Sequence, residues 1–308
     1  MAGKILIIFD FDRTLIEEDS DRWVLTNMGL TNLFYQLQST LPWNSLMDSM
    51  LEEIHLQGKT VNDIEECLQQ VPLHTRIVEV TKTAHALGCD LKVVSDSNAF
   101  YIRTILEHYG IYNCFSEIIT NPIVVEDRGR LRIFPYNDMD SPHSCDLCPP
   151  NLCKNLLKLE IIPAPLIHPP TKNGKWLAVR SSPALERLGG VIERIQSSIS
   201  ESERKRLIYV GDGRNDFCPT LKLDAGDFVM PRMNFPLFDR ILNNRALVKA
   251  KVHEWSNWEE LATILHELIN YISNEEEVEC RTANQLNSVE YNNEAPGSTN
   301  EPLTVVTD

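Results

Sequence analysis

The sequence predicts an α/β fold with a parallel sheet, on two observations. Short apolar runs lead directly into small or acidic residues at three places, residues 4–9, 89–98 and 206–216. Uninterrupted runs of this length are typical of strands that are buried on both faces of a sheet. The chain between the runs carries apolar residues at helical spacing, and strands that alternate with helices favour a parallel sheet. A fourth run, residues 227–231, is expected to add a further strand.

The remaining elements follow from apolar spacing and from turn residues. Residues 22–88 combine helical spacing with interrupting glycines and prolines, so we expect several helices that form a small module. A helix is expected over residues 99–109, a hairpin over 124–135 and a closing helix over 257–273. Residues 273–308 are rich in Asp and Glu, and we expect a disordered acidic tail there.

Charge and composition disfavour several classes of partner. The 308 residues suffice for one α/β domain with a smaller insert, and the net charge is −15. This acidic balance argues against nucleic acid and anionic membranes, and a small anionic substrate would need a local cation. No apolar run reaches the roughly 18 residues of a membrane span, and the first residues do not resemble a signal peptide. The eight cysteines then suggest reduced thiols in a cytoplasmic protein, and no obligate protein partner is indicated.

Carboxylates gather where the predicted strands end. Asp10 and Asp12 are two residues apart, so in an extended chain both side chains point to the same side. Polar residues that follow different parallel strands can converge at one edge of the sheet, where ligands bind. These residues are Asp10, Asp12, Ser95, Asp96, Asp212 and Asp216. A single Asp after a strand is more often a turn residue or a helix cap, but three such strand ends favour a site for Mg²⁺, which prefers oxygen ligands.

Three short motifs carry a resemblance to a known family. The segments DFDRT (10–14), VVSDSN (93–98) and GDGRND (211–216) resemble motifs of the haloacid dehalogenase-like phosphatases. Longer segments, DFDRTLIEEDSD, HSCDLCPPNLCK and YVGDGRNDFCPTLKL, are similar to the phosphoethanolamine/phosphocholine phosphatase family and to its plant thiamine phosphate phosphatase-like and pyrophosphatase-like members. The resemblance implies a Rossmann-like core over residues 1–21 and 86–272, with a helical cap over residues 22–85 inserted after the first strand.

The resemblance also implies roles for the matched catalytic residues. Asp10 would be the nucleophile that forms an aspartyl phosphate, and Asp12 the general acid and then the general base. Lys154 would balance the charge on the nucleophile and the phosphate. Mg²⁺ would be the cofactor, and its site would be formed by Asp10, the Asp12 carbonyl, Asp212 and Asp216.

Four further residues are expected to bind the substrate. The resemblance implies that Thr14 and Ser95 hydrogen-bond the phosphoryl oxygens. It associates Asp21 and Asp96 with a cationic head group, which a carboxylate attracts. An alternative interpretation makes Asp21 the N-cap of the first cap helix, and the sequence favours neither reading.

The expected function is the magnesium-dependent hydrolysis of a small phosphorylated metabolite. Phosphocholine and phosphoethanolamine come first, and thiamine monophosphate, pyrophosphate and pyridoxal phosphate are alternatives. Residues 155–189 depart from the family pattern as an irregular, proline-containing insertion directly after Lys154. A second alternative is therefore a catalytically impaired variant, although the motif aspartates argue against it.

A cluster of possible metal ligands lies just before the insertion. His143, Cys145, Cys148 and Cys153 include a Cys-x-x-Cys pair and could hold a structural zinc ion. The alternative is that these are reduced cysteines that pack a loop near the site. The sequence alone favours this alternative, because the family is not defined by zinc at these positions.

Overall fold

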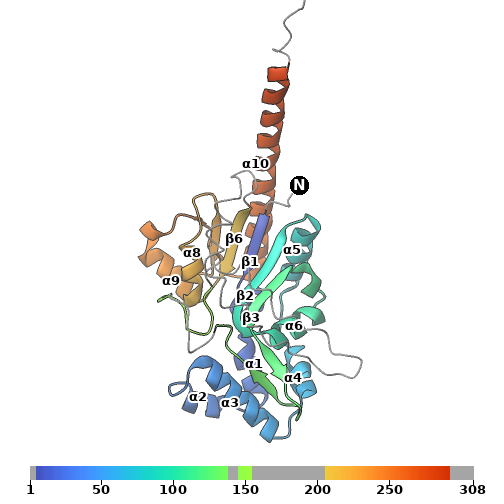
Figure 1. The fold of residues 1–308 in the computed structure, drawn as a ribbon, viewed down its shortest axis with the longest axis vertical. Coiled ribbons are helices and arrows are strands. Elements are labelled where there is room, and N and C mark those ends of the chain that lie inside the picture. The colour runs from blue at the N-terminus through green and yellow to red at the C-terminus, as the bar shows by residue number, and fades with distance from the viewer. Residues whose placement is uncertain (1–4, 138–144, 155–204, 292–308) are drawn as a thin grey trace, which may run out of the picture.

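A six-stranded parallel sheet forms the centre of the molecule. The structure is a computed structural model that describes residues 5–137, 145–154 and 205–291, with side chains as far as Glu275. The strand order is β3-β2-β1-β6-β7-β8 (Figure 1). The strands are β1 Ile5–Phe9, β2 Asp90–Asn98, β3 Glu117–Asn121, β6 Arg206–Gly211, β7 Phe228–Pro231 and β8 Lys251–Val252. The predicted α/β fold with a parallel sheet is confirmed, although the sequence did not predict the short strands β3 and β8.

Strand β1 lies in the middle of the sheet and fixes where the motifs meet. Its last residue, Phe9, pairs with Val93 of β2 and with Val210 of β6. All three strands run in the same direction, so the residues that follow them lie side by side at one edge. The three motifs identified in the sequence therefore share this edge, although they are far apart along the chain.

The sheet is covered on both faces, and β1 contributes to both cores. Ile7 belongs to a large apolar cluster with Val93 and Ile208 that also includes residues of α5 (Thr75–Ala86), α6 (Ala99–His108) and α10 (Trp258–Tyr291). Its neighbour Ile8 belongs to a second cluster with Tyr209 and with residues of α9 (Pro236–Asn243). Successive strand residues point to opposite faces, so an uninterrupted apolar run is what a sheet covered on both sides requires.

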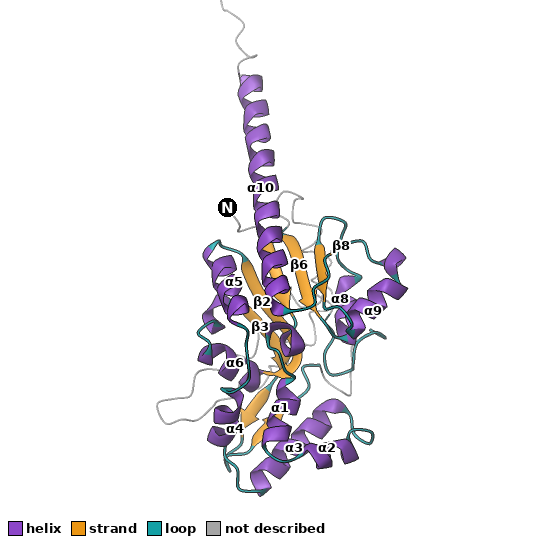
Figure 2. Cartoon of the chain, turned by 180° about the vertical axis from the view of Figure 1, so that it is seen from behind, coloured by secondary structure: helices purple, strands orange, loops and turns teal. Residues whose placement is uncertain are grey.

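Four helices and a hairpin lie beyond the carboxyl ends of the strands (Figures 1 and 2). The helices are α1 Ser20–Asn27, α2 Thr31–Leu37, α3 Trp43–Leu56 and α4 Val61–Leu68, and the hairpin consists of β4 Ile123–Val125 and β5 Leu131–Ile133. The hairpin, which the sequence predicted, packs on α3, where Asp48 forms an ion pair with Arg130 at 2.7 Å and accepts a hydrogen bond from the Ile133 amide. Helix α5 falls within the predicted cap range 22–85, but it packs against α10 and β2. The helices that lie beyond the strand ends are therefore α1–α4.

The last helix is longer than expected. Helix α10 continues to Tyr291, so the prediction of disorder from residue 273 onward is wrong for residues 273–291. The acidic composition suggested an unfolded tail, but the segment contains no proline or glycine and has several good helix formers. Residues 292–308, like the predicted insertion 155–189, lie outside the described residues. Within the described part of the chain, no helix has both the length and the apolar content of a membrane span.

Candidate active site

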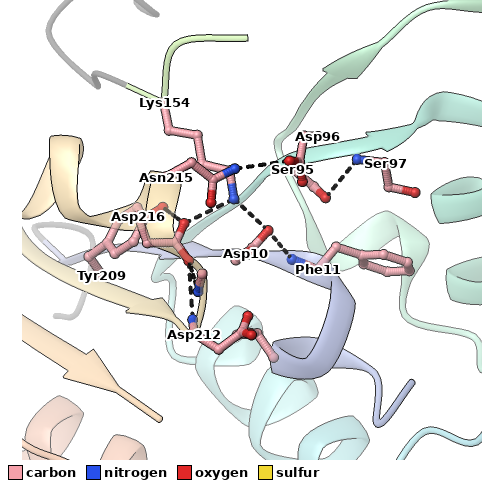
Figure 3. Close-up of polar contacts among 12 residues, drawn as sticks. Asp10, Phe11, Ser95, Asp96, Ser97, Lys154, Tyr209, Asp212, Asn215 and Asp216 are labelled. Carbon is pink, nitrogen blue, oxygen red and sulfur yellow. Dashed lines mark hydrogen bonds and ion pairs between the residues drawn. The ribbon is translucent and has the colours of Figure 1, made fainter. Parts of the chain in front are cut away.

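The candidate active site lies at the edge where β1, β2 and β6 end (Figure 3). Asp10 follows β1, Ser95 and Asp96 lie near the end of β2, and Asp212 follows β6. A fourth segment, residues 145–154, brings Lys154 to the same place, directly beside Asp10. The structure thus brings together residues from four separate parts of the chain, as the strand pattern predicted for all except Lys154.

Asp10 is held in one orientation by three contacts. Its backbone amide donates to the carbonyl of Val210 at 2.9 Å, which ties it to the end of β6. Its Oδ1 accepts hydrogen bonds from the Phe11 amide at 2.7 Å and from the Lys154 Nζ at 2.8 Å. Burial and the nearby Asp216 raise the pKa of Asp10 well above its usual value, and Lys154 opposes this shift. The lysine therefore favours the ionised carboxylate that a nucleophile needs.

Lys154 is fully buried and forms ion pairs with two carboxylates. Its Nζ lies 2.8 Å from Oδ1 of Asp10 and 2.9 Å from Oδ1 of Asp216. Burial alone would lower the pKa of this amine, but the attraction of Asp10 and Asp216 outweighs burial and raises the pKa well above its usual value. Lys154 therefore stays charged and partly balances the acidic cluster.

Asp216 uses both carboxylate oxygens to order its surroundings. Its Oδ1 accepts from Lys154 and, at 2.7 Å, from the hydroxyl of Tyr209. Its Oδ2 accepts from the amides of Asp212 at 3.1 Å and Gly213 at 2.7 Å. Gly211 leaves space for this carboxylate, since a Cβ at position 211 would lie 2.6 Å from Oδ2. Asp216 is thus suited to position Lys154 and Asp212.

Three of the carboxylates can hold a metal ion. Oxygen atoms of Asp10, Asp212 and Asp216 all lie within 4.8 Å of one another. Among the described residues, Oδ2 of Asp212 has no hydrogen-bond partner and can serve as a ligand, and the Asp10 carboxylate lies within reach of the same ion. Burial and Asp216 raise the pKa of Asp212 to about 7, which shows that the cluster lacks positive charge. An all-oxygen donor set with excess negative charge fits a hard divalent cation such as Mg²⁺.

Thr14 contacts this cluster. Its buried hydroxyl donates to Oδ1 of Asp212 at 3.1 Å, so in the structure it supports a carboxylate. Ser95 is also fully buried, and its Oγ accepts from the amide of Ser97 at 3.2 Å. Thr14 already donates its hydroxyl proton to Asp212, whereas Ser95 only accepts and can still donate. The predicted contacts of both residues with phosphoryl oxygens stay predictions.

The side chain of Asp12 points to the cap helices and is not part of the three-carboxylate cluster. Arg13, at a left-handed φ of 57°, makes the turn that follows it. The Oδ1 of Asp12 accepts from the Ser20 amide, at the start of α1, at 2.7 Å. Burial and Asp19 raise the pKa of Asp12 well above its usual value. A raised pKa favours the protonated carboxyl that a general acid needs, and the predicted role of Asp12 stays a prediction.

Asp21 lies in the cap helix α1, and Asp96 lies near the end of core strand β2. Asp21 is buried, and its Oδ2 accepts from the indole Nε1 of Trp43 at 3.2 Å. Burial, then the charges of Asp19 and Asp12, raise its pKa well above the usual value. The alternative interpretation of Asp21 as a helix cap is wrong, because the cap of α1 is Asp19, which accepts from the Arg22 amide.

Two asparagines position Asp96, and sequence reasoning missed both. Asn215 Nδ2 donates to Oδ2 of Asp96 at 3.0 Å, and Asn121 Nδ2 donates to its backbone carbonyl at 2.6 Å. Tyr209 was missed as well, because it occupies an apolar strand position where its hydroxyl gives no pattern. Asn215 lies within the GDGRND motif, which was a usable signal.

Comparisons with known proteins agree with this geometry. The model of a family described as "Putative Phosphatase" matches residues 5–164 and 181–269. A thiamine phosphate phosphatase-like protein of Arabidopsis thaliana is 48% identical, over 89% of this chain and 99% of that protein. Inorganic pyrophosphatase 2 of the same plant is 44% identical, over 90% and 88%. The pyridoxal phosphate phosphatase PHOSPHO2 of Bos taurus is 26% identical, over 86% and 99%.

These matches cover most of the chain and include the segments that supply Asp10, Lys154 and Asp212. They confirm the resemblance that the three motifs carry in the sequence. The chain therefore belongs to this phosphatase family and is a phosphatase.

Proposed function

We propose that the enzyme hydrolyses small phosphomonoesters that carry a cationic organic group, with magnesium as cofactor and an aspartyl phosphate on Asp10 as intermediate. Phosphocholine, phosphoethanolamine and thiamine monophosphate all belong to this class. The observation that carries the proposal is the buried Asp21, whose Oδ2 accepts a hydrogen bond from the indole of Trp43. Burial, and then the charges of Asp19, Asp12 and Asp96, raise its pKa well above the usual value. A cationic group would relieve this repulsion.

The contacts of Asp10 support its role as nucleophile. Lys154 and the Phe11 amide both bind Oδ1, which leaves Oδ2 to form the bond to phosphorus. In the first step Oδ2 bonds to phosphorus, the ester P–O bond breaks, and Asp12 gives its proton to the leaving oxygen. In the second step Asp12 takes a proton from water as the water oxygen attacks phosphorus, which releases phosphate and restores Asp10.

Positive charge comes from two sources in this scheme. Lys154 balances Asp10 and Asp216 and lies within reach of a phosphoryl group bonded to Asp10. Bound magnesium would add charge stabilisation for the phosphoryl oxygens, and Asp10 and Asp212 are the side chains suited to hold it. The Asp12 carbonyl is the further ligand that the family resemblance implies.

The surroundings of Asp21 support a cationic substituent on the substrate. Asp21 accepts from Trp43, and Trp43 also lines a cavity of about 460 Å³ that is bounded by α3, by β5 and by residues 149–151. Neither Asp21 nor Asp10 lines this cavity, so Trp43 is the residue that links it to the buried carboxylate. An indole wall next to a buried carboxylate suits a cationic group, since both the charge and the aromatic face attract it.

Pyrophosphate is the second candidate. Two Arabidopsis relatives at 44% and 45% identity are named inorganic pyrophosphatases. Pyrophosphate would place a second anionic group where the ester substituent lies, close to Asp21 and Asp96, and like charges repel. This argument ranks it below the cationic esters. Pyridoxal phosphate follows, supported by relatives near 26% identity.

A catalytically impaired enzyme is the remaining alternative. It was suggested by the insertion 155–189, which lies outside the described residues. The contacts of Lys154 support an active enzyme, because this residue precedes the insertion and still forms ion pairs with Asp10 and Asp216.

A substrate panel tests the proposal. The full chain is assayed with phosphocholine, phosphoethanolamine, thiamine monophosphate, pyridoxal phosphate, pyrophosphate and 4-nitrophenyl phosphate, first with Mg²⁺ and then with EDTA. We expect the cationic esters to have the highest kcat/KM and EDTA to abolish turnover. Turnover that does not need the metal, or pyrophosphate as the best substrate, would contradict the proposal.

A charge-removing variant tests the role of Asp21 separately. Asp21→Asn should raise KM for the cationic esters by about tenfold, since a hydrogen bond or ion contact to a charged group contributes about 1.5–3 kcal/mol. It should leave 4-nitrophenyl phosphate, which has no cationic group, nearly unchanged. Asp127→Asn, on the exposed turn of the hairpin, is the matched control. Equal losses on both kinds of substrate would assign Asp21 a structural role.

A further inference from the structure

Four cysteine sulfurs form a compact cluster next to the candidate active site. The Sγ atoms of Cys145, Cys148, Cys153 and Cys218 all lie within 4.8 Å of one another, and those of Cys145 and Cys218 are 3.3 Å apart. Three of the cysteines come from residues 145–153, and the fourth comes from the short helix α8 (Phe217–Thr220). Among the described residues, no cysteine is in a disulfide.

We propose that these four cysteines bind a structural zinc ion. Zinc prefers four tetrahedral sulfur ligands in closed sites, with Zn–S bonds of about 2.3 Å, so the sulfurs would be about 3.8 Å apart. The Cys145–Cys218 separation of 3.3 Å and the upper limit of 4.8 Å on the others are compatible with this value. The sequence offered three cysteines and His143, and it favoured reduced cysteines because the family is not defined by zinc at these positions. Cys218 supplies the fourth sulfur, and His143, outside the described residues, is not needed.

The surroundings of Cys148 suit a thiolate ligand. The backbone amide of Lys154 donates to its sulfur, a contact that favours the ionised form. In the metal-free protein, a hydrogen bond with Cys153 raises the pKa of Cys148 to about 12. The thiol of Cys148 therefore keeps its proton near neutral pH in the metal-free protein, which disfavours a catalytic role for this cysteine. Zinc binding would displace these protons to the solvent as each Zn–S bond forms.

The proposed zinc site joins the two segments that carry the catalytic charges. Cys153 directly precedes Lys154, and Cys218 lies two residues after Asp216. Lys154 and Asp216 form the 2.9 Å ion pair that holds the lysine beside Asp10. We infer that the zinc site fixes these segments against each other, so its cysteines act as positioning residues for Lys154. This positioning role, unlike zinc binding itself, rests on the proposed function.

Metal analysis of the full chain tests the zinc site directly. Protein purified without added metal should contain about one zinc per chain by elemental analysis. Cys218→Ser should lose most of this zinc, whereas Cys114→Ser, a half-buried cysteine outside the cluster, should keep it. Cys145→His, which can still ligate zinc, should retain much more metal than Cys145→Ser.

Three results would overturn the zinc site. The first is wild-type protein that contains no zinc and whose four thiols all react with an alkylating reagent. The second is a pair of disulfides among these four cysteines. The third is stoichiometric iron in place of zinc. The wild-type measurement decides the question even if the serine variants do not fold. Zinc content does not depend on turnover, so an inactive protein with one zinc would refute the proposed function and leave the zinc site intact.

Kinetics test the positioning role. If zinc positions Lys154, Cys145→Ser should lower kcat for 4-nitrophenyl phosphate more than it raises KM, and Cys145→His should recover most of kcat together with its zinc. A zinc-free Cys145→Ser protein that is folded and keeps the full kcat would contradict this role.

Discussion

Two clusters of potential metal ligands lie side by side in this phosphatase, and the same two chain segments contribute to both. The carboxylate cluster contains Asp10, Asp212 and Asp216, whereas the sulfur cluster contains only cysteines. Residues 145–154 supply Lys154 to the first and three sulfurs to the second. Residues 212–218 likewise supply two carboxylates and Cys218.

The difference in donor atoms separates their tasks. Oxygen ligands suit Mg²⁺, which keeps several coordination positions for water and substrate phosphate. Four thiolates complete a tetrahedron around zinc and leave no position for a substrate. The carboxylate cluster can therefore perform chemistry, while the proposed zinc site would hold the segments that build it.

The largest expected effect comes from the carboxylate side. Asp10→Asn removes the nucleophilic oxygen and should lower kcat for 4-nitrophenyl phosphate by roughly 10⁴-fold or more. Its zinc content should equal that of the wild type, because the sulfur cluster does not use Asp10. Turnover close to the wild-type rate would eliminate Asp10 as nucleophile.

Lys154 lies where the two clusters meet, and its removal should have the next largest effect. Lys154→Met should lower kcat by about 10²–10³-fold, the usual cost of losing one charge-stabilising group. Because Lys154 lowers the pKa of Asp10, the acid limb of the kcat/KM profile should move to higher pH. The control Lys205→Met removes an exposed surface lysine. An unchanged pH profile would contradict the coupling of Lys154 to Asp10.

The pH dependence of magnesium affinity tests whether Asp212 in the carboxylate cluster is a metal ligand. The pKa of Asp212 is raised to about 7, so protons compete with the metal below that pH. The apparent affinity for Mg²⁺, measured by calorimetry, should fall by up to about tenfold per pH unit below about pH 7. A constant affinity between pH 5.5 and 8 would rule out Asp212 as a ligand that must lose a proton.

The same shift affects the stability of the metal-free protein. Asp212 binds its proton more tightly in the folded state than in the unfolded state, where its pKa is about 3.9. The free energy of unfolding should therefore decrease as pH rises from about 4 to about 7. Added magnesium should stabilise the protein more at pH 8 than at pH 6, as measured by thermal unfolding.

The smallest expected effect lies in the cap helices, away from both clusters. The hydroxyl of Thr60 accepts from a backbone amide three residues later and caps helix α4. Thr60→Ala should lower the free energy of unfolding by about 1 kcal/mol in denaturant titrations. Zinc content and kcat for 4-nitrophenyl phosphate should not change, and a loss of either would couple the cap to the two clusters.

The sequence was sufficient to predict the fold and the meeting of the aspartates where the apolar pattern of single segments agrees with the parallel topology of the sheet. The run before Asp10 and the run before Asp212 predict strands, and parallel pairing of β1 with β6 then brings the two aspartates together. Helix α10 shows the opposite case, because acidic composition suggested disorder where residues 273–291 are helical.

The missed residues depend on contacts between distant segments. Cys145 and Cys218 are 73 residues apart, and no local spacing links them. Tyr209 looks like an apolar strand residue until the structure shows its hydroxyl donating to Asp216. The sequence could not decide whether Asp21 caps the first cap helix. The structure excludes this interpretation, because Asp19 caps α1.

Covalent trapping is the most direct test of the central claim that Asp10 becomes phosphorylated. In Asp12→Asn, attack by Asp10 on 4-nitrophenyl phosphate can still proceed, because nitrophenolate leaves without a proton, but the water that should release phosphate lacks its base. Intact-mass and peptide analysis should find one phosphoryl group on Asp10, and only when Mg²⁺ is present. Full turnover in this variant, or a phosphoryl group on another residue, would contradict the account.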